Sequence, residues 1–155
     1  MTGPIVQARD LVKEFDAGGR RLVAVNHVSF AIGAGETLGL VGESGSGKST
    51  TGRLLVGLIP ASGGEVRLFG ESITGDARAL SRVRKRLQFV FQDPQGSLDP
   101  RMRVGDSIAE PLDVAGGWSR RDRSGRVTEL LETVGLPRES AGRFPHEFSG
   151  GQRQR

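Results

Sequence analysis

Residues 42–50 read Gly42-Glu43-Ser44-Gly45-Ser46-Gly47-Lys48-Ser49-Thr50, and this stretch decides the fold. It fits the pattern G-x-x-x-x-G-K-[ST], in which a loop turns successive backbone N–H groups inward around the phosphates of a nucleotide. Glycine is needed where the loop takes unusual φ values and where a phosphate approaches the backbone closely. Lys48 would reach the β- and γ-phosphates, and the Ser49 hydroxyl would ligate Mg²⁺. All nine residues are therefore predicted to form a nucleotide-binding loop.

The flanks of this loop favour the same prediction. Residues 36–41 read as a short buried strand, and a helix is expected from about Lys48 to Leu58, stopped by Pro60. Its apolar stripe consists of Leu54, Leu55 and Leu58. A strand, a glycine-rich loop and a helix in this order direct the positive end of the helix dipole at the bound phosphates.

The composition is that of one modest globular domain. The chain has 155 residues, of which 35% are apolar and 26% charged, so a hydrophobic core can form. There is no cysteine, which excludes disulfides and thiolate metal sites. The N-terminus lacks the apolar run of a signal peptide, and no segment approaches the ~20 apolar residues that span a bilayer. We expect a soluble or peripheral protein.

The first half of the chain is rich in strand signals. Residues 5–15 and 22–32 read as two strands joined by a turn at 16–20. Residues 65–69 alternate polar and apolar side chains, which is typical of a half-buried strand. Residues 87–91 form a second strong apolar strand.

The second half is predicted to be mainly helical. A short basic helix is expected over residues 78–86, and residues 98–147 form a helical region. Apolar side chains recur at helical spacing at Val104, Ile108 and Leu112. Ser119, with Asp122 three residues later, resembles a capping box that opens a further helix, which ends at Gly135.

Basic residues gather in two clusters, at 82–86 and 120–126, and the net charge is +4. A nucleic-acid surface would be one explanation, and strong salt-dependent binding to DNA or RNA would support it. The chain has no tyrosine and one tryptophan, and no aromatic residues are interleaved with the basic ones as base stacking requires. We therefore favour solvated helix faces and expect no nucleic-acid partner.

Two further motifs narrow the function. Phe148-Ser149-Gly150-Gly151-Gln152 resembles the signature sequence of ABC-type ATPases, and Phe91-Gln92-Asp93-Pro94 resembles their Q-loop. The order and approximate spacing of the three motifs also match that family. Ser149 can cap a helix, and two glycines expose backbone N–H groups at its positive end, which favours an anion.

The resemblance implies a role for each motif. Ser149, Gly150, Gly151 and Gln152 would contact the γ-phosphate of ATP held by a second nucleotide-binding domain, so that two domains sandwich two ATPs. Gln92 would lie near Mg²⁺ and the attacking water, and its loop would link to the membrane partner. Phe15 lies where the family often has an aromatic that stacks on adenine, although a core phenylalanine is the alternative. His27 and His146 carry no spacing signal and are interpreted as structural.

The resemblance covers residues 5–155. The segments at 38–50, 91–94, 97–102, 108–112 and 145–155 are similar to those of ATP-binding subunits of oligopeptide and dipeptide importers, although nickel and other importers share these features. It implies an α/β fold, that of a P-loop NTPase of the ABC type, with an antiparallel β subdomain and a helical subdomain. The β subdomain and P-loop core would span about 1–97, the helical subdomain about 98–148 and the signature 148–155. The cofactors would be ATP and Mg²⁺.

The implied function is to energise solute uptake, most simply of peptides, from the cytoplasmic inner face of the membrane. The partners would be a second nucleotide-binding domain, forming a homo- or heterodimer, the transmembrane permease subunits and an upstream peptide-binding protein.

The chain departs from the family pattern after the signature. A complete member continues into an apolar strand that ends in the Walker B aspartate, followed by a catalytic glutamate, a D-loop and a switch histidine. Residues 1–155 contain none of these, so we expect the N-terminal part of such an ATPase, with weak ATP binding and poor hydrolysis. The next strand would lie beside residues 36–41 in the central sheet, and without it apolar surface would be exposed.

Two other readings remain open. In a different phosphate-loop NTPase, Asp93 could be the Mg²⁺-linked acid at the end of the apolar strand, although Pro94 follows it directly. Alternatively, the chain could be a non-catalytic module that docks on membrane subunits or on intact partners without turnover.

Overall fold

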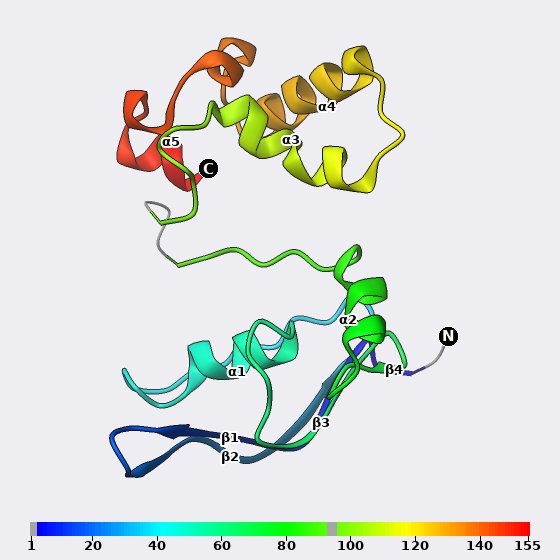
Figure 1. Cartoon of the computed structure of the whole chain (residues 1–155), viewed down its shortest axis with the longest axis vertical. Coiled ribbons are helices and arrows are strands. Elements are labelled where there is room, and N and C mark those ends of the chain that lie inside the picture. The colour runs from blue at the N-terminus through cyan, green and yellow to red at the C-terminus, as the bar shows by residue number, and fades with distance from the viewer. Residues whose placement is uncertain (1–2, 93–95) are drawn as a thin grey trace. The chain divides into compact units, whose positions relative to one another are not determined.

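The computed structural model describes residues 3–92 and 96–155. The chain divides into two compact units, Met1–Phe89 and Val90–Arg155, each with its own arrangement of elements (Figure 1). The division falls a few residues before the boundary near residue 97 that the sequence predicts. Within the described ranges, no helix is both long enough and apolar enough to cross a membrane.

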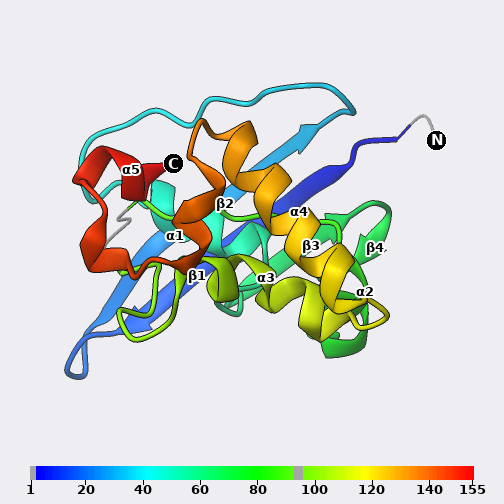
Figure 2. The same ribbon diagram turned by 90° about the horizontal axis from the view of Figure 1, so that it is seen from above.

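An antiparallel sheet forms the base of the first unit. Its strands are β1 (Val6–Asp16), β2 (Arg21–Ile32), β3 (Gly63–Leu68) and β4 (Glu71–Ser72), in the order β2-β1-β3-β4. The long β1–β2 hairpin runs from the Val6–Ile32 pair to the Asp16–Arg21 pair beside the turn (Figure 1, Figure 2). This confirms the two N-terminal strands and the half-buried strand near residues 65–69 that the sequence predicts.

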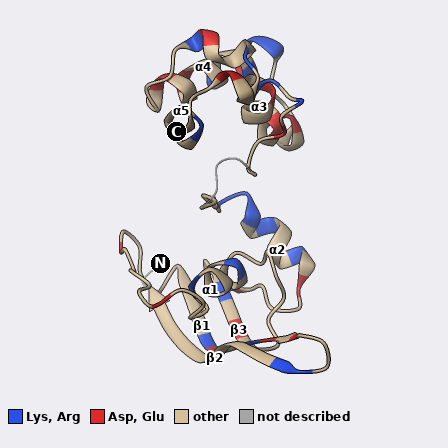
Figure 3. Ribbon diagram, turned by 90° about the vertical axis from the view of Figure 1, so that its left-hand side faces the viewer, with Lys and Arg blue, Asp and Glu red and all other residues tan. Residues whose placement is uncertain are grey.

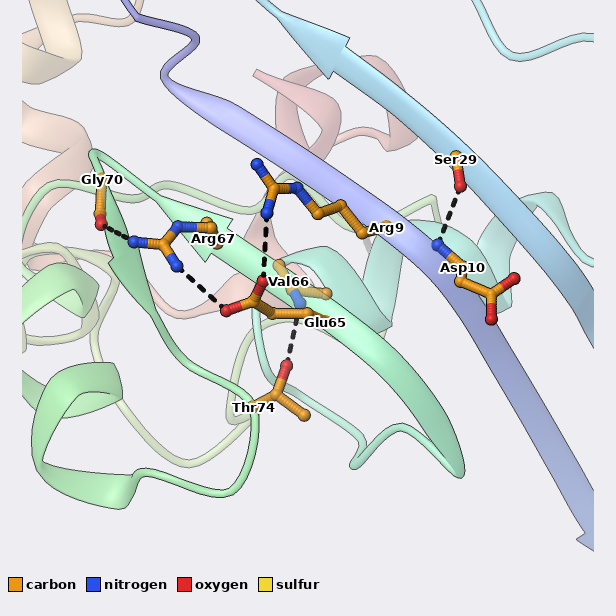
Figure 4. Close-up of polar contacts among 8 residues, drawn as sticks. All are labelled: Arg9, Asp10, Ser29, Glu65, Val66, Arg67, Gly70 and Thr74. Carbon is orange, nitrogen blue, oxygen red and sulfur yellow. Dashed lines mark hydrogen bonds and ion pairs between the residues drawn. The ribbon is translucent and has the colours of Figure 1, made fainter.

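Side-chain contacts reinforce the sheet at its polar positions (Figure 4). Glu65 on β3 accepts ion pairs from Arg9 at 3.9 Å and from Arg67 at 3.1 Å. A hydrogen bond from Ser72, followed by the charge of Arg67, lowers the pKa of Glu65. The Asp10 N–H donates to the Ser29 hydroxyl at 2.8 Å, because the β1–β2 register shifts here and a side chain replaces a ladder partner.

Two helices cover this sheet. They are α1 (Lys48–Leu55) and α2 (Ala77–Arg84) (Figure 1). Leu54 from α1 and Val83 from α2 belong to the core. The other buried members of that core are Ala8, Leu11, Val25, Val66, Leu68 and Ile73. The helix α1 ends earlier than the sequence predicts, at Leu55, because Gly57 follows with φ of 66° and turns the chain before Pro60.

Basic residues recur along α2 and just after it (Figure 3). Arg82 pairs with Glu71 at 2.7 Å, and Arg84 donates to the Gly57 carbonyl at 3.3 Å. Arg86, just after the helix, lies 3.6 Å from the ring centroid of Phe69. These arginines therefore have partners within their own unit.

The predicted strands at residues 36–41 and 87–91 are wrong. Both segments are irregular, and neither pairs with a strand in the part of the chain that the structure describes. Most of their apolar side chains face solvent, with Val41 93% and Val90 85% exposed, whereas Leu87 packs against the core of the first unit. An apolar, β-prone run becomes a strand only where a neighbouring strand accepts its backbone hydrogen bonds and covers its side chains, and the sheet of the first unit does neither.

The second unit is helical, as predicted. It contains α3 (Val104–Ala115), α4 (Arg120–Thr133), the 3₁₀ turns η1 (Arg138–Gly142) and η2 (Pro145–Glu147), and α5 (Gly150–Gln154). Its core consists of Val104, Ala109, Val127, Leu131, Leu136 and Phe148. Glycine at 105 permits the close approach of α3 to the Ala141 carbonyl, which a Cβ would meet at 2.8 Å.

The cap of α4 forms differently from the predicted capping box. The Ser119 hydroxyl oxygen accepts the Asp122 N–H at 3.2 Å, which confirms the N-cap. The Asp122 carboxylate accepts the proton of the same hydroxyl at 2.7 Å instead of the Ser119 backbone N–H. An aspartate is one carbon shorter than the glutamate or glutamine of a capping box, so its reach back is shorter.

Candidate functional site

The glycine-rich stretch forms a tight loop that runs directly into α1. Gly47 is the N-cap of α1 with φ of 90°, and Gly45 has φ of 84°, values that L side chains rarely adopt. The Ser46 N–H donates to the Glu43 carbonyl at 3.2 Å and closes the turn. Thr51 ties the loop to the helix, because its N–H and its hydroxyl both donate to the Gly47 carbonyl, at 2.8 and 3.0 Å.

Gly47 rests directly on strand β2. A Cβ atom at this position would lie 2.2 Å from the carbonyl oxygen of Ala24, which is closer than any real contact. Only glycine at position 47 therefore allows the loop to contact the backbone of β2 this closely. Gly42 is less constrained, since its Cβ would lie 2.8 Å from the Ser46 hydroxyl oxygen, a side-chain atom that can rotate away.

The Lys48 ammonium lies at the centre of the loop. Its Nζ donates to the carbonyl oxygens of Gly42 at 2.8 Å and Glu43 at 2.5 Å, and to the Ser46 hydroxyl at 3.3 Å. A cation at the positive end of a helix favours an anionic group at the same place.

Ser49 and Thr50 begin the first turn of α1, with Ser49 exposed and Thr50 half-buried. Nowhere in residues 3–92 or 96–155 do three His, Cys, Asp or Glu side chains gather as a metal-binding group. The single hydroxyl of Ser49 suits Mg²⁺, which is usually held by one or two protein oxygens together with phosphates and water.

Phe15 lies at the end of β1, where its ring is 40% exposed. The Lys13 ammonium lies 4.9 Å from the ring centroid, within cation–π range. The surface beside the β1–β2 turn forms a hollow of about 430 Å³ whose lining includes Phe15, Arg20 and Ser62. Sequence reasoning missed Lys13, and its only signal was a cation two residues before an aromatic on the same strand.

The signature residues form the start of α5. The Ser149 hydroxyl accepts the Gln152 N–H at 3.3 Å, and the Gln152 side-chain oxygen accepts the Ser149 N–H at 2.9 Å. This reciprocal capping box confirms that Ser149 caps a helix, and it leaves Gly150 and Gly151 exposed. Phe148, 5% exposed, anchors the segment in the core of the second unit.

The structure thus gathers the predicted residues in two places. The nine loop residues and Phe15 belong to the first unit, and Gln92 and the signature belong to the second. Gln92 is exposed on a bend, and Asp93, the alternative Mg²⁺-linked acid, lies outside the described residues. The roles assigned to Gln92, Phe15 and the signature stay predictions.

Both histidines make contacts within their own units. His27 Nδ1 lies 2.7 Å from a carboxylate oxygen of Asp10, and the His146 ring stacks on Phe144 with centroids 5.7 Å apart. Neither histidine belongs to the phosphate loop at residues 42–50.

Comparison with known proteins gives consistent matches. A family model described as ABC transporter matches residues 25–155. A solved structure of the ATP-binding cassette MJ0796, dimeric, in a post-hydrolysis state and bound to ADP and Pi, superposes with a TM-score of 0.86 and 29% identity. The superposition covers 96% of this chain and 65% of the cassette.

Two curated relatives are named for import. A Brucella abortus (strain 2308) protein named as a peptide import ATP-binding protein is 62% identical over 159 residues, covering 97% of this chain and 48% of the relative. The glutathione import ATP-binding protein GsiA of Escherichia coli (strain K12) is 51% identical over 160 residues, covering 98% and 26%. This chain therefore spans about half or less of the length of these relatives.

Proposed function

Because this chain belongs to the ABC transporter family, we propose that it is the ATP-binding part of an importer ATPase. In this role it binds ATP through the loop at residues 42–50 and energises the uptake of a solute. The observation that carries the proposal is the Lys48 ammonium, held by loop carbonyls at 2.5 and 2.8 Å at the start of a helix. A lysine ammonium in a glycine-rich loop at the start of a helix is the setting in which a triphosphate binds.

Different residues of the loop bind different parts of the nucleotide. Backbone N–H groups between Gly42 and Gly47 hold the β- and γ-phosphates, and Lys48 neutralises their charge. Ser49 supplies a hydroxyl ligand to Mg²⁺, which when bound offsets the negative charge of the phosphates. Phe15 provides an exposed ring at the end of β1 on which adenine stacks.

The partner of this chain is a second nucleotide-binding domain. Ser149, Gly150 and Gly151 present hydroxyl and backbone N–H donors at the start of α5, where the partner's γ-phosphate is held. The capping box gives Gln152 the supporting role of fixing Ser149. Support for a dimer comes from the ATP-binding cassette MJ0796, whose solved structure is described as dimeric.

Import requires a permease in the membrane and a solute to carry. The curated relatives are named for peptide and glutathione import, and glutathione is itself a small peptide, so a peptide is the solute class we propose. The chain then works at the cytoplasmic face, on transmembrane subunits contacted through the segment around Gln92. A binding protein outside the membrane delivers the peptide.

A non-catalytic ATP-binding module is the second candidate. It is favoured by the irregular segment at 36–41, where Val41 is 93% exposed, since incomplete packing beside a phosphate loop weakens its support. Both candidates require ATP binding, and they differ in turnover. An assay of phosphate release by the wild type and Lys48→Ala separates them, because only the ATPase shows turnover that depends on Lys48.

ATP binding itself is tested by thermal melts with and without excess Mg-ATP. A ligand that binds only the folded state raises the Tm. At a ligand concentration one hundred times its Kd, it adds about 2.7 kcal/mol to the free energy of unfolding. We expect an upward shift for the wild type and none for Lys48→Ala, whose melt without ligand should be similar. Equal shifts for both proteins would reject the loop at 42–50 as the binding site.

A further inference from the structure

We propose that Lys13 is a positioning residue for the nucleotide base: it holds the Phe15 ring in the orientation on which adenine stacks. The inference deepens the proposed function and rests on it, since it needs a nucleotide in the loop at residues 42–50. Lys13 has no place in the phosphate-loop or signature motifs, and its role follows from its contacts alone.

The first observation is that Lys13 is fixed at its charged end. Its ammonium lies 4.9 Å from the Phe15 ring centroid and donates a hydrogen bond to the Pro60 carbonyl at 2.8 Å. The ammonium therefore sits between an aromatic face and a backbone oxygen. A cation at this distance is attracted to the electron-rich face of the ring.

The second observation is that the anchor is itself rigid. The Ser62 N–H donates to the Val12 carbonyl at 2.9 Å, and the Glu14 N–H donates to the Ser62 hydroxyl at 3.0 Å. These bonds attach residues 60–62 to β1 on both sides of Lys13. Proline at position 60 also has a fixed φ, which removes one of the two backbone dihedrals that place the carbonyl accepting from Lys13.

The anchor also connects the ring to the phosphate loop. Residues 56–60 lead directly out of α1, and α1 begins at Lys48 of the loop. Lys13 thus links the ring at the end of β1 to the segment that leaves the phosphate-binding helix. These contacts fix the position of the Phe15 ring relative to the phosphate loop. A nucleotide needs this, because its base and its phosphates lie at opposite ends.

Phe15 needs such support because its ring is 40% exposed and lies at the end of a strand. A half-exposed side chain loses rotamer freedom when a ligand immobilises it, and this loss weakens binding. A cation that already occupies one face of the ring removes part of the loss and leaves the other face for the base. The expected consequence is tighter binding of the nucleoside and no change in binding of the phosphates.

Lys13→Met tests this, because methionine keeps an unbranched apolar side chain and removes the charge. Kd is measured for Mg-ATP and for Mg-tripolyphosphate, which has the phosphates but no base. We expect Lys13→Met to raise the Kd for Mg-ATP about threefold to tenfold and to leave that for tripolyphosphate unchanged. Lys13→Arg, whose guanidinium also stacks on aromatic rings, should bind Mg-ATP like the wild type.

A double-mutant cycle with Phe15→Ala shows whether Lys13 acts through the ring. Phe15→Ala alone should weaken Mg-ATP about tenfold, and adding Lys13→Met should then have no further effect. Additive losses, or equal weakening of tripolyphosphate, would overturn the positioning role, and so would unchanged Mg-ATP binding by Lys13→Met. Melts without ligand confirm that each variant is folded. A wild type that binds neither ligand would instead reject the proposed function.

Discussion

A Cβ atom on Gly47 would lie 2.2 Å from the carbonyl oxygen of Ala24, so the phosphate loop can rest on β2 only if residue 47 is glycine. The φ of Gly47, 90°, is also one that alanine rarely adopts. We expect Gly47→Ala to reduce the free energy of unfolding by about 2–4 kcal/mol, from backbone strain and steric overlap together. Urea titration of the two proteins measures the difference.

Gly45→Ala is the matched control for that variant. Gly45 has a similar φ of 84°, but nothing lies within 4 Å of the position of its Cβ. Gly45→Ala should therefore reduce the free energy of unfolding by the backbone strain alone, about 1–2 kcal/mol. If the two substitutions cost the same, the contact with Ala24 contributes nothing to the placement of the loop.

Ser149→Arg should block the ATP-dependent dimer and leave ATP binding by the single chain intact. The Ser149 hydroxyl caps α5 by accepting the Gln152 N–H, and an arginine would place a bulky cation on the surface that we propose faces the partner. Analytical ultracentrifugation with and without Mg-ATP follows the dimer, and ligand-induced thermal shift follows binding. Ser149→Thr keeps a capping hydroxyl and serves as the control. An unchanged dimer in Ser149→Arg would count against the signature assignment.

The sequence predicted the elements whose stabilising contacts are local. The β1–β2 hairpin joins strands that are neighbours in the chain, and the helices α3 and α4 have apolar periodicity and an N-cap at Ser119. The phosphate loop was equally predictable, because glycine at 47 and lysine at 48 are required by backbone geometry and by charge.

Other features depended on contacts that a sequence pattern does not encode. Residues 36–41 and 87–91 have strand-like composition, yet a strand in a central sheet needs neighbours on both sides. The described residues supply none, and both segments remain irregular. Lys13 was missed for a related reason, since its contact with the Pro60 carbonyl joins positions 47 residues apart.

Asp76 should make the free energy of unfolding of the first unit depend on pH in the acidic range. Its carboxylate caps α2 by accepting the N–H groups of Arg78 and Ala79, both at 2.9 Å. The hydrogen bond from Ala79 is the main cause that lowers the pKa of Asp76. Because the folded pKa is below the unfolded one, the stabilisation is complete above about pH 4 and is lost as the pH falls through the folded pKa.

The Tm of Asp76→Asn against pH isolates this contribution. Asparagine keeps a capping oxygen but does not titrate, so the difference in Tm between wild type and variant should shrink as the pH falls below about 4. Glu65, Asp99 and Glu139 also have lowered pKa values and contribute equally to both curves. A difference that stays constant across the acid range would show that the Asp76 cap does not depend on its charge.

Leu131→Ala should destabilise the second unit without loosening the sheet of the first. Leu131 is 1% exposed and packs in the core that includes Val127 and Phe148, whereas Leu11 and Leu68 belong to a separate core. Truncating a buried leucine costs about 2–5 kcal/mol, because the removed methyl groups leave a cavity. Hydrogen exchange should accelerate in α3 and α4, while amides of β1 and β3 keep their protection.

Leu68→Ala provides the reciprocal experiment. It should accelerate exchange in β1 and β3 and leave α4 protected, since Leu68 is also 1% exposed but lies in the other core. Two cores that respond separately would mean that the phosphate loop and the signature are stabilised independently, so that a defect in one leaves the other folded. Faster exchange throughout the chain in both variants would instead show that the two units unfold as one.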